Sequence, residues 1–242
     1  SLKDFTGLTA GQYTISEDDP APAGYQLRYI RCSVSTDNSN DYVSFFGDTA
    51  TRSVTVDMGP NERAHCTFVN EKLGSITIVK DAEPADDTVF GFGFLSSSGA
   101  APFVLQDPTK PSQLVPDLPA DRYGVVEAPQ AGWVLNDIRC VSTLGTSAYD
   151  IDVAAGTLGI DLAAGDDVTC TFVNKKLGTI IIGKTTLPAD IGPQFEFTQT
   201  IAPADGTFTI NHGGSSVFQE VLHGQYTVTE INVPAGWRLR NL

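Results

Sequence analysis

The stretch that decides the fold is CTFVNEKLGSITIVK at residues 66–80, which returns as CTFVNKKLGTIIIGK at residues 170–184. Both copies alternate apolar and polar residues, which is the period of a β-strand with one buried face. A third block, Tyr-x-x-x-Glu followed by a Gly-aromatic pair, begins at Tyr13, Tyr123 and Tyr226. Ordered motifs that return at one period of about 104 positions indicate a tandem repeat.

The repeat divides the chain into one complete unit and two partial ones. Residues 73–176 form the middle unit, residues 1–72 the later part of a first unit, and residues 177–242 the earlier part of a third. A unit of about 100 residues suits a β-sandwich that folds independently. We therefore expect an all-β chain of tandem β-sandwiches, cut from a longer array. Few residues separate successive units, so the connections should be stiff.

The composition excludes several classes of function. The 242 residues include 29 acidic and 15 basic side chains, for a net charge of −14. Such a surface repels phosphate backbones, so we expect no nucleic-acid partner. No run approaches the roughly 18 apolar residues that a membrane span needs, so we expect no membrane insertion in this segment. The absence of an initiator Met at Ser1 suggests a processed or excised piece.

Sequence motifs for catalysis, metals and cofactors are missing. The acidic clusters at residues 17–19, 81–87 and 166–167 lack the ligand spacing of a calcium loop, so we expect solvated turn carboxylates and no metal. No HExxH or GxSxG motif occurs, and no histidine recurs between units. We therefore predict that the protein is not an enzyme and needs no cofactor. The alternating aromatic residues at 90, 92 and 94 are expected in the core, with a carbohydrate-binding platform as the alternative.

Each of the first two units carries one pair of cysteines at equivalent positions. Cys32 and Cys66 are 34 positions apart, and Cys140 and Cys170 are 30 apart. One even pair per unit, without CxxC spacing or clustered histidines, favours disulfides over zinc. The alternative is a pair of reduced core thiols in a cytosolic protein. Disulfides would place the protein outside a reducing cytosol.

Strand parity puts three polar side chains on faces that are otherwise apolar. Lys80 shares a face with two isoleucines, Glu127 with Tyr123 and a valine, and Asn174 with Cys170 and a phenylalanine. A buried charge is costly unless it is paired. The three side chains should therefore converge inside the sandwich or escape to its rim.

These residues resemble a known family. A first strand ending in Lys-Asp, a central Tyr-x-x-x-Glu with a Gly-aromatic turn, and a last strand ending in Asn are similar to the B-type repeats of collagen adhesins and to SpaA-type pilin domains. The resemblance implies tandem prealbumin-like (transthyretin-like, Ig-like) sandwiches. It also implies an intramolecular isopeptide bond between the lysine and the asparagine, assisted by the glutamate. The implied trio is Lys80, Glu127 and Asn174 in the middle unit. The partial trios are Glu17 with Asn70 in the first unit and Lys184 with Glu230 in the third.

Two readings of the middle trio stay open at this point. In one, the isopeptide bond forms because burial lowers the pKa of the lysine and raises that of the glutamate. In the other, Lys80 lies at the rim beside Glu127 while Asn174 caps a turn. The disulfide already cross-links the last strand. Its presence departs from the usual pattern of these domains in Gram-positive bacteria.

The expected function is structural. We predict a module of an extracellular or cell-surface stalk, fibre or adhesin, whose partners are neighbouring repeats or copies of itself in an array or filament. The alternative is a module that binds a host protein or glycan through loops or strand edges.

Overall fold

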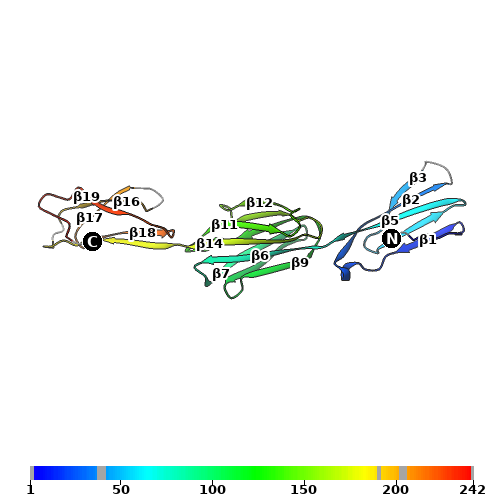
Figure 1. Cartoon of the computed structure of the whole chain (residues 1–242), viewed down its shortest axis with the longest axis horizontal. Coiled ribbons are helices and arrows are strands. Elements are labelled where there is room, and N and C mark those ends of the chain that lie inside the picture. The colour runs from blue at the N-terminus through cyan, green and yellow to red at the C-terminus, as the bar shows by residue number, and fades with distance from the viewer. Residues whose placement is uncertain (1–2, 37–41, 190–191, 202–205, 241–242) are drawn as a thin grey trace.

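Nearly all regular structure in the protein is β-strand, which confirms the all-β prediction. The computed structural model describes residues 3–36, 42–189, 192–201 and 206–240, and within them only one short 3₁₀ helix, Ala21–Ala23, interrupts the strands. The molecule is elongated, and three groups of strands follow one another from the N-terminus to the C-terminus (Figure 1). None of the described segments forms a helix both long and apolar enough to span a bilayer.

The middle unit is a sandwich of two sheets. One sheet has five strands in the order β12-β13-β10-β7-β8, and the other has four in the order β11-β14-β6-β9. The strands are β6 (Gly74–Glu83), β7 (Asp86–Ser96), β8 (Gly99–Asp107), β9 (Ser112–Leu118), β10 (Arg122–Glu127), β11 (Trp133–Ser142), β12 (Ala148–Asp152), β13 (Thr157–Asp161) and β14 (Asp167–Lys176).

The core of the middle unit lies between these two sheets. Phe90, Phe92 and Phe94 of β7 are all buried there, as strand alternation predicts, and Ile76 and Ile78 of β6 face them from the other sheet. The buried phenylalanines provide no aromatic platform at the surface, so the carbohydrate-binding alternative for these residues is wrong.

The first and last strands of the middle unit pair directly and in parallel. Strand β6 runs beside β14 in an unbroken register from Ser75↔Asp167 to Glu83↔Lys175. This pairing places the lysine of the first strand near the asparagine of the last, because Lys80 lies opposite Phe172.

The strands before and after the middle unit form four smaller sheets. In the first unit β1 (Gly11–Ser16) pairs with β4 (Ser53–Met58), and a second sheet has the order β3-β2-β5. In the third unit β15 pairs with β18, and the other sheet has the order β17-β16-β19. The remaining strands are β2 (Tyr25–Thr36), β3 (Tyr42–Phe46), β5 (Glu62–Lys72), β15 (Gly178–Gly183), β16 (Phe195–Gln199), β17 (Gly206–Ile210), β18 (Ser215–Val221) and β19 (Val228–Ile231).

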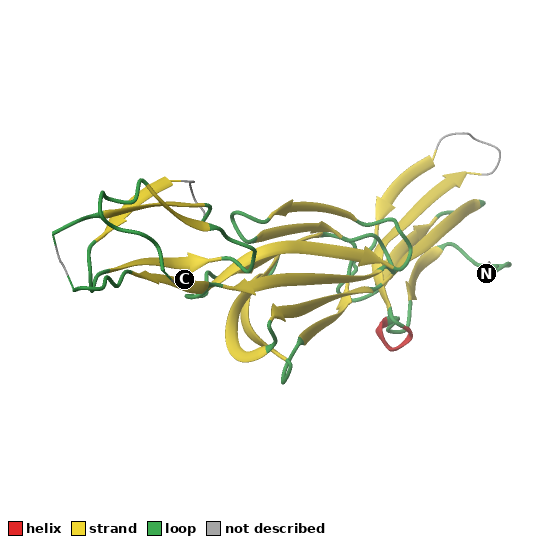
Figure 2. Cartoon of the chain, turned by 60° about the vertical axis from the view of Figure 1, so that its left-hand side comes forward, coloured by secondary structure: helices red, strands yellow, loops and turns green. Residues whose placement is uncertain are grey.

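A single residue separates the last strand of one unit from the first strand of the next. Leu73 lies between β5 and β6, and its N–H donates to the carbonyl of Gly24, 2.9 Å away. Leu177 takes the same place between β14 and β15 and donates to Gly132 at 2.8 Å. The connection is thus hydrogen-bonded at equivalent positions, and the strands run on from unit to unit (Figure 2).

Asp166 is wholly buried, which corrects the expectation that it is a solvated turn carboxylate. Its carboxylate accepts five hydrogen bonds from the end of β11 and the loop that follows; the donors are Ser142 Oγ, Thr143 Oγ1, Leu144 N, Ser147 N and Ser147 Oγ. Burial raises the pKa of this carboxyl, but the hydrogen bonds together lower it by more, so the pKa is well below its usual range. The charged form of Asp166 therefore organises this end of the sandwich.

Replacing Asp166 by asparagine is expected to destabilise the middle unit by about 3 kcal/mol, because an amide cannot satisfy the same donors. The lowered pKa means that the contribution of Asp166 is fully present above the pKa of the unfolded chain and is lost as the pH falls through the folded value. Urea midpoints below and above about pH 4 should show that the difference between wild type and variant shrinks in acid. The exposed Asp18→Asn is the control, and an equal effect of both substitutions would contradict the prediction.

Candidate functional site

The three polar residues of the middle unit meet inside the sandwich. Lys80 comes from β6 and Asn174 from β14, neighbours in the four-stranded sheet, while Glu127 ends β10 in the opposite sheet. The exposed fractions are 1% for Lys80, 5% for Glu127 and 3% for Asn174. Lys80 is therefore buried inside the sandwich and does not lie at its rim.

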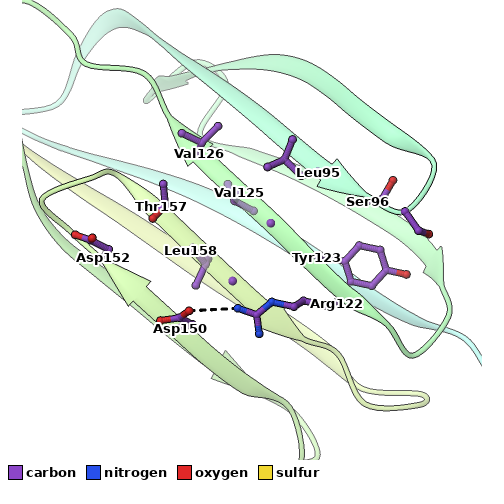
Figure 3. A pocket seen from close by; sticks show the side chains of 13 residues that line it. Leu95, Ser96, Arg122, Tyr123, Val125, Val126, Asp150, Asp152, Thr157 and Leu158 are labelled. Carbon is purple, nitrogen blue, oxygen red and sulfur yellow. Dashed lines mark hydrogen bonds and ion pairs between the residues drawn. The ribbon is translucent and has the colours of Figure 1, made fainter.

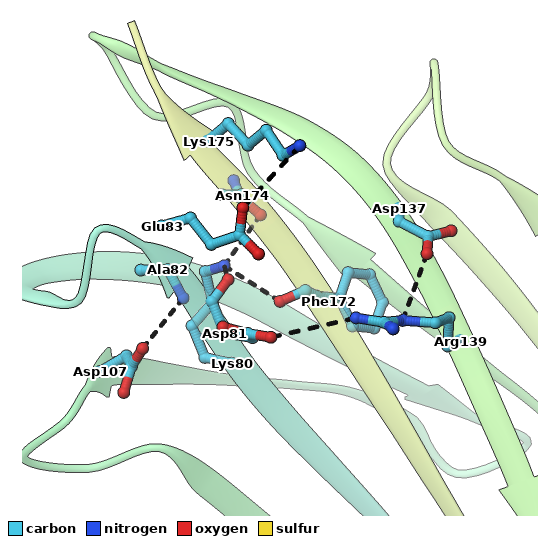
Figure 4. A network of polar contacts seen from close by, with 10 residues as sticks. All are labelled: Lys80, Asp81, Ala82, Glu83, Asp107, Asp137, Arg139, Phe172, Asn174 and Lys175. Atoms are coloured by element: carbon cyan, nitrogen blue, oxygen red, sulfur yellow. Dashed lines mark hydrogen bonds and ion pairs between the residues drawn. The ribbon is translucent and has the colours of Figure 1, made fainter. Parts of the chain in front are cut away.

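The side chains are linked in a chain of hydrogen bonds. Lys80 Nζ donates to Asn174 Oδ1 at 2.8 Å and to the backbone carbonyls of Phe172 and Asp81 at 3.1 Å (Figure 4). Asn174 Nδ2 in turn donates to Glu127 Oε1 at 2.8 Å. In the part of the chain that the structure describes, the buried Glu127 Oε2 has no hydrogen-bond partner. The amide of Asn174 thus lies between the amine and the carboxyl.

The surroundings shift both titratable groups toward their neutral forms. Burial lowers the pKa of Lys80 to about 8, against the attraction of the Glu127, Asp81 and Asp107 carboxylates, which raises it. Burial likewise raises the pKa of Glu127, while the charge of Lys80 and the hydrogen bond from Asn174 act in the opposite direction. A neutral amine is a nucleophile and a protonated carboxyl is an acid, so the directions suit acyl transfer.

The ring of Phe90, which strand alternation predicts only as a core residue, lies against the amine of Lys80. Lys80 Nζ lies 4.2 Å from the ring centroid of Phe90, and the Phe90 and Trp133 rings are packed edge to face with their centroids 5.4 Å apart. The third unit repeats this arrangement with Lys184 over Phe195 at 4.0 Å and Trp237 at 5.6 Å from that ring. The signal in the sequence is an aromatic residue 10 or 11 positions after the lysine in both units.

Ion pairs on the outer side of the sheet neutralise the carboxylates near the trio. Asp81 lies 4.0 Å from Arg139, which also pairs with Asp137 at 3.2 Å (Figure 4). Glu83 pairs with Lys175 at 3.8 Å. These contacts are solvent-exposed, so each contributes little to stability.

A β-bulge lies opposite the asparagine that ends the last strand, in the middle unit and in the first unit. In the middle unit Leu135 pairs with Asn174 and Asp137 with the preceding residue, which leaves Asn136 unpaired. In the first unit Leu27 pairs with Asn70 in the same way, which leaves Arg28 without an opposite residue in the strand ladder. An extra residue resets strand parity, so apolar side chains on both sides of the bulge face the core. Its signal in the sequence is the repeated Leu-x-x-Ile-Arg-Cys at residues 27–32 and 135–140.

The partial trios are also in contact. In the first unit Asn70 Nδ2 donates to Glu17 Oε1 at 2.6 Å. In the third unit Lys184 Nζ donates to Glu230 Oε1 at 2.6 Å, with the Glu230 side chain only 3% exposed. Every pair predicted within a unit is therefore adjacent in space.

Both cysteine pairs form disulfides between adjacent antiparallel strands. Cys32 of β2 is bonded to Cys66 of β5, and Cys140 of β11 to Cys170 of β14. Among the described residues no cysteine is free. The second disulfide lies on the same strand as Asn174, four positions away, so β14 takes part in both sites.

A shallow hollow of about 640 Å³ lies on the outer face of the five-stranded sheet (Figure 3). Its charged lining residues are Arg122 of β10 and Asp150 and Asp152 of β12. The guanidinium of Arg122 pairs with Asp150 at 3.2 Å and with Asp161 at 3.0 Å. The hollow is therefore an open acidic surface rather than an enclosed pocket.

Comparisons with known proteins place the fold. A family model described as a prealbumin-like fold domain matches residues 1–72 and 76–176. No curated protein gives a significant sequence match.

Three of the solved structures to which the chain is similar are bacterial proteins. The TIE protein of Bacillus anthracis is 16% identical, with a TM-score of 0.40, over 92% of this chain and 45% of that one. A Mobiluncus mulieris adhesin with disulfide, isopeptide and ester cross-links is 15% identical, with a TM-score of 0.34, over 57% of this chain and 54% of that one. The major pilin of Streptococcus pyogenes is 12% identical, with a TM-score of 0.47, over 70% and 99%. The chain thus spans about half the length of the first two.

Proposed function

Because the chain belongs to the family of prealbumin-like fold domains, we propose that it is a structural tandem-repeat module of an extracellular stalk, fibre or surface adhesin. The observation that carries the proposal is the buried contact of Lys80, Asn174 and Glu127, whose geometry suits a covalent cross-link. The protein would modify itself once and would catalyse no turnover.

The proposed reaction is an isopeptide bond between Lys80 and Asn174. Glu127 takes a proton from the amine through its free Oε2, and the neutral Nζ attacks Cγ of Asn174. The Cγ–Nδ2 bond then breaks as Glu127 delivers that proton to Nδ2, which lies 2.8 Å from its Oε1 and leaves as ammonia. Nζ loses its second proton to Glu127 as it becomes the amide nitrogen, so the reaction ends with a neutral isopeptide bond, ammonia and a protonated Glu127. No other reactant is needed. The fold holds the amine beside the amide, so the reaction is intramolecular and does not depend on the concentration of a second molecule.

The same units are proposed to recur along the parent protein. Residues 73–176 would be one complete unit, with residues 1–72 and 177–242 as parts of its neighbours. The contacts of Glu17 with Asn70 and of Lys184 with Glu230 support this division. Each partial unit has two residues at positions equivalent to those of the middle trio, and these two are in contact as they are in a complete unit.

The same features support an oxidising location and an array of neighbouring repeats. Disulfides persist outside the cytosol, so the two bonds support a location on the cell surface or beyond it. One-residue connections support end-to-end stacking, with adjacent repeats as the first partners. We propose no glycan or host-protein ligand.

The intact mass of the purified chain under reducing conditions tests the proposal. We expect a deficit of one ammonia molecule relative to the sequence, and a branched peptide that joins Lys80 to Asn174 after proteolysis. A full-length chain at its unmodified mass after reduction would overturn the isopeptide bond and leave the disulfides as the cross-links of the module.

A further inference from the structure

Strand β3 of the first unit is an unprotected sheet edge. It pairs with β2 on one side only, and its sequence, YVSFF, contains no charged residue and no proline. Tyr42, Val43 and Phe46 are 65%, 72% and 71% exposed, so apolar side chains are open on both faces of the strand. Natural edges are usually protected by charges, prolines or bulges, because an open edge is a template for another strand.

The outer face beside this edge is basic and aromatic. The register aligns three rows of side chains across β3, β2 and β5; they are Phe46-Arg31-Thr67, Ser44-Ser33-His65 and Tyr42-Ser35-Arg63. None of the nine is acidic, although the chain has 29 acidic and 15 basic residues. Among the described residues neither Arg31 nor Arg63 takes part in an ion pair. Tyrosine, phenylalanine and arginine are the residues enriched at protein interfaces.

The middle unit carries an edge of opposite charge. Strand β12 ends the five-stranded sheet and pairs with β13 only. Its side chains Asp150 and Asp152 are exposed at the acidic hollow (Figure 3), and Ile151 between them is 40% exposed. Both β3 and β12 lie at the margin of the molecule in Figure 1.

We propose that copies of this chain associate side by side, with the β3 edge of one copy paired to the β12 edge of the next. The added strand would continue the β3-β2-β5 sheet and bring the carboxylates of Asp150 and Asp152 toward the arginine face. Pairing β3 with the β3 of a second copy would instead place two arginine faces together, and like charges oppose such a contact. This inference deepens the proposed structural role without resting on the isopeptide bond.

The contact has consequences for the form of the assembly. It joins two different surfaces, so a pair of copies keeps one free β3 edge and one free β12 edge, and association does not close at a dimer. The other edge of the same sheet, along β5, has no part in the proposed contact. Strand β5 is equivalent to β14 of the middle unit, where the same edge is occupied by β6. The structure therefore assigns one lateral contact between copies.

Sedimentation velocity of the full chain over a wide range of concentration tests the inference. The average mass should rise continuously with concentration and fall when salt is added, because exposed charges are screened. Val43→Lys should abolish association, whereas Val141→Lys, which alters an equally exposed valine on β11, should not. Arg31→Glu and Asp150→Lys should each weaken association at least about tenfold.

A mixture of the two charge-reversal variants gives the sharpest result. Arg31→Glu and Asp150→Lys copies are complementary to each other, so mixing them should restore association to a level that neither variant reaches alone. A monomer at every concentration, a mass that stops at a dimer, or equal loss in Val43→Lys and Val141→Lys would overturn the inference. Thermal midpoints and intact masses of the same samples separate misfolding and loss of the isopeptide bond from loss of the contact.

Discussion

Replacing Glu127 by glutamine is expected to leave the chain heavier than the wild type by about the mass of one ammonia molecule. The amide of glutamine cannot accept a proton from Lys80 and deliver it to Asn174 Nδ2, so the cross-link should not form although the fold is kept. The matched control is Glu83→Gln, at an exposed carboxylate that pairs with Lys175 and should leave the deficit intact. A deficit that persists in Glu127→Gln would show that this carboxyl is not the acid–base group.

The stability of this variant should fall as well. The bond would close a loop between residues 94 positions apart, and in the chain-entropy model such a closure stabilises by roughly 4–5 kcal/mol. The thermal midpoint of the middle unit should therefore drop sharply in Glu127→Gln and remain unchanged in Glu83→Gln. An unchanged midpoint with the deficit lost would show that the bond adds nothing to equilibrium stability.

Removing the second disulfide by Cys140→Ala together with Cys170→Ala is the other change with a large expected effect. The bond closes a loop of 30 positions, which corresponds to roughly 3–4 kcal/mol in the chain-entropy model. Cys170 is fully buried, so its truncation adds a small cavity to that loss. Urea unfolding of the double variant measures the sum.

The mass of the same double variant separates the two cross-links. The ammonia deficit should remain, because Lys80, Glu127 and Asn174 are positioned by strand pairing and by the opposite sheet rather than by the cysteines. Loss of both the disulfide and the deficit would show that the disulfide forms first and aligns β14 for the reaction.

Much of the fold and the trio could be predicted from the sequence. Strict alternation at residues 76–80, 123–127 and 170–174 fixes which side chains face inward, so three polar residues on apolar faces had to meet or reach the rim. The repeat supplied the unit length, and the family match confirms the resemblance to prealbumin-like domains. These signals are local and periodic, which is why they can be read without a structure.

The rest depends on contacts between segments that share no pattern. Asp166 reads as one member of an acidic turn, and only the fold shows five donors converging on it. The β-bulge at Asn136 shifts parity by one position, which alternation alone cannot place. Equivalent strands also change sheets: β3 pairs with β2, whereas β12 pairs with β13. Such choices are made by tertiary packing rather than by propensity.

The parallel pairing of β6 and β14 sets how the middle unit would bear a pulling force. The chain enters at the start of β6 and leaves at the end of β14, so opposite ends of two adjacent parallel strands would be pulled. The ladder between them is then loaded in shear, and its hydrogen bonds must give way together rather than one after another. A bond from Lys80 to Asn174 would shorten the path of the force further, because tension would pass directly between the strands and bypass the residues from 81 to 173. The unit would then transmit load without extending.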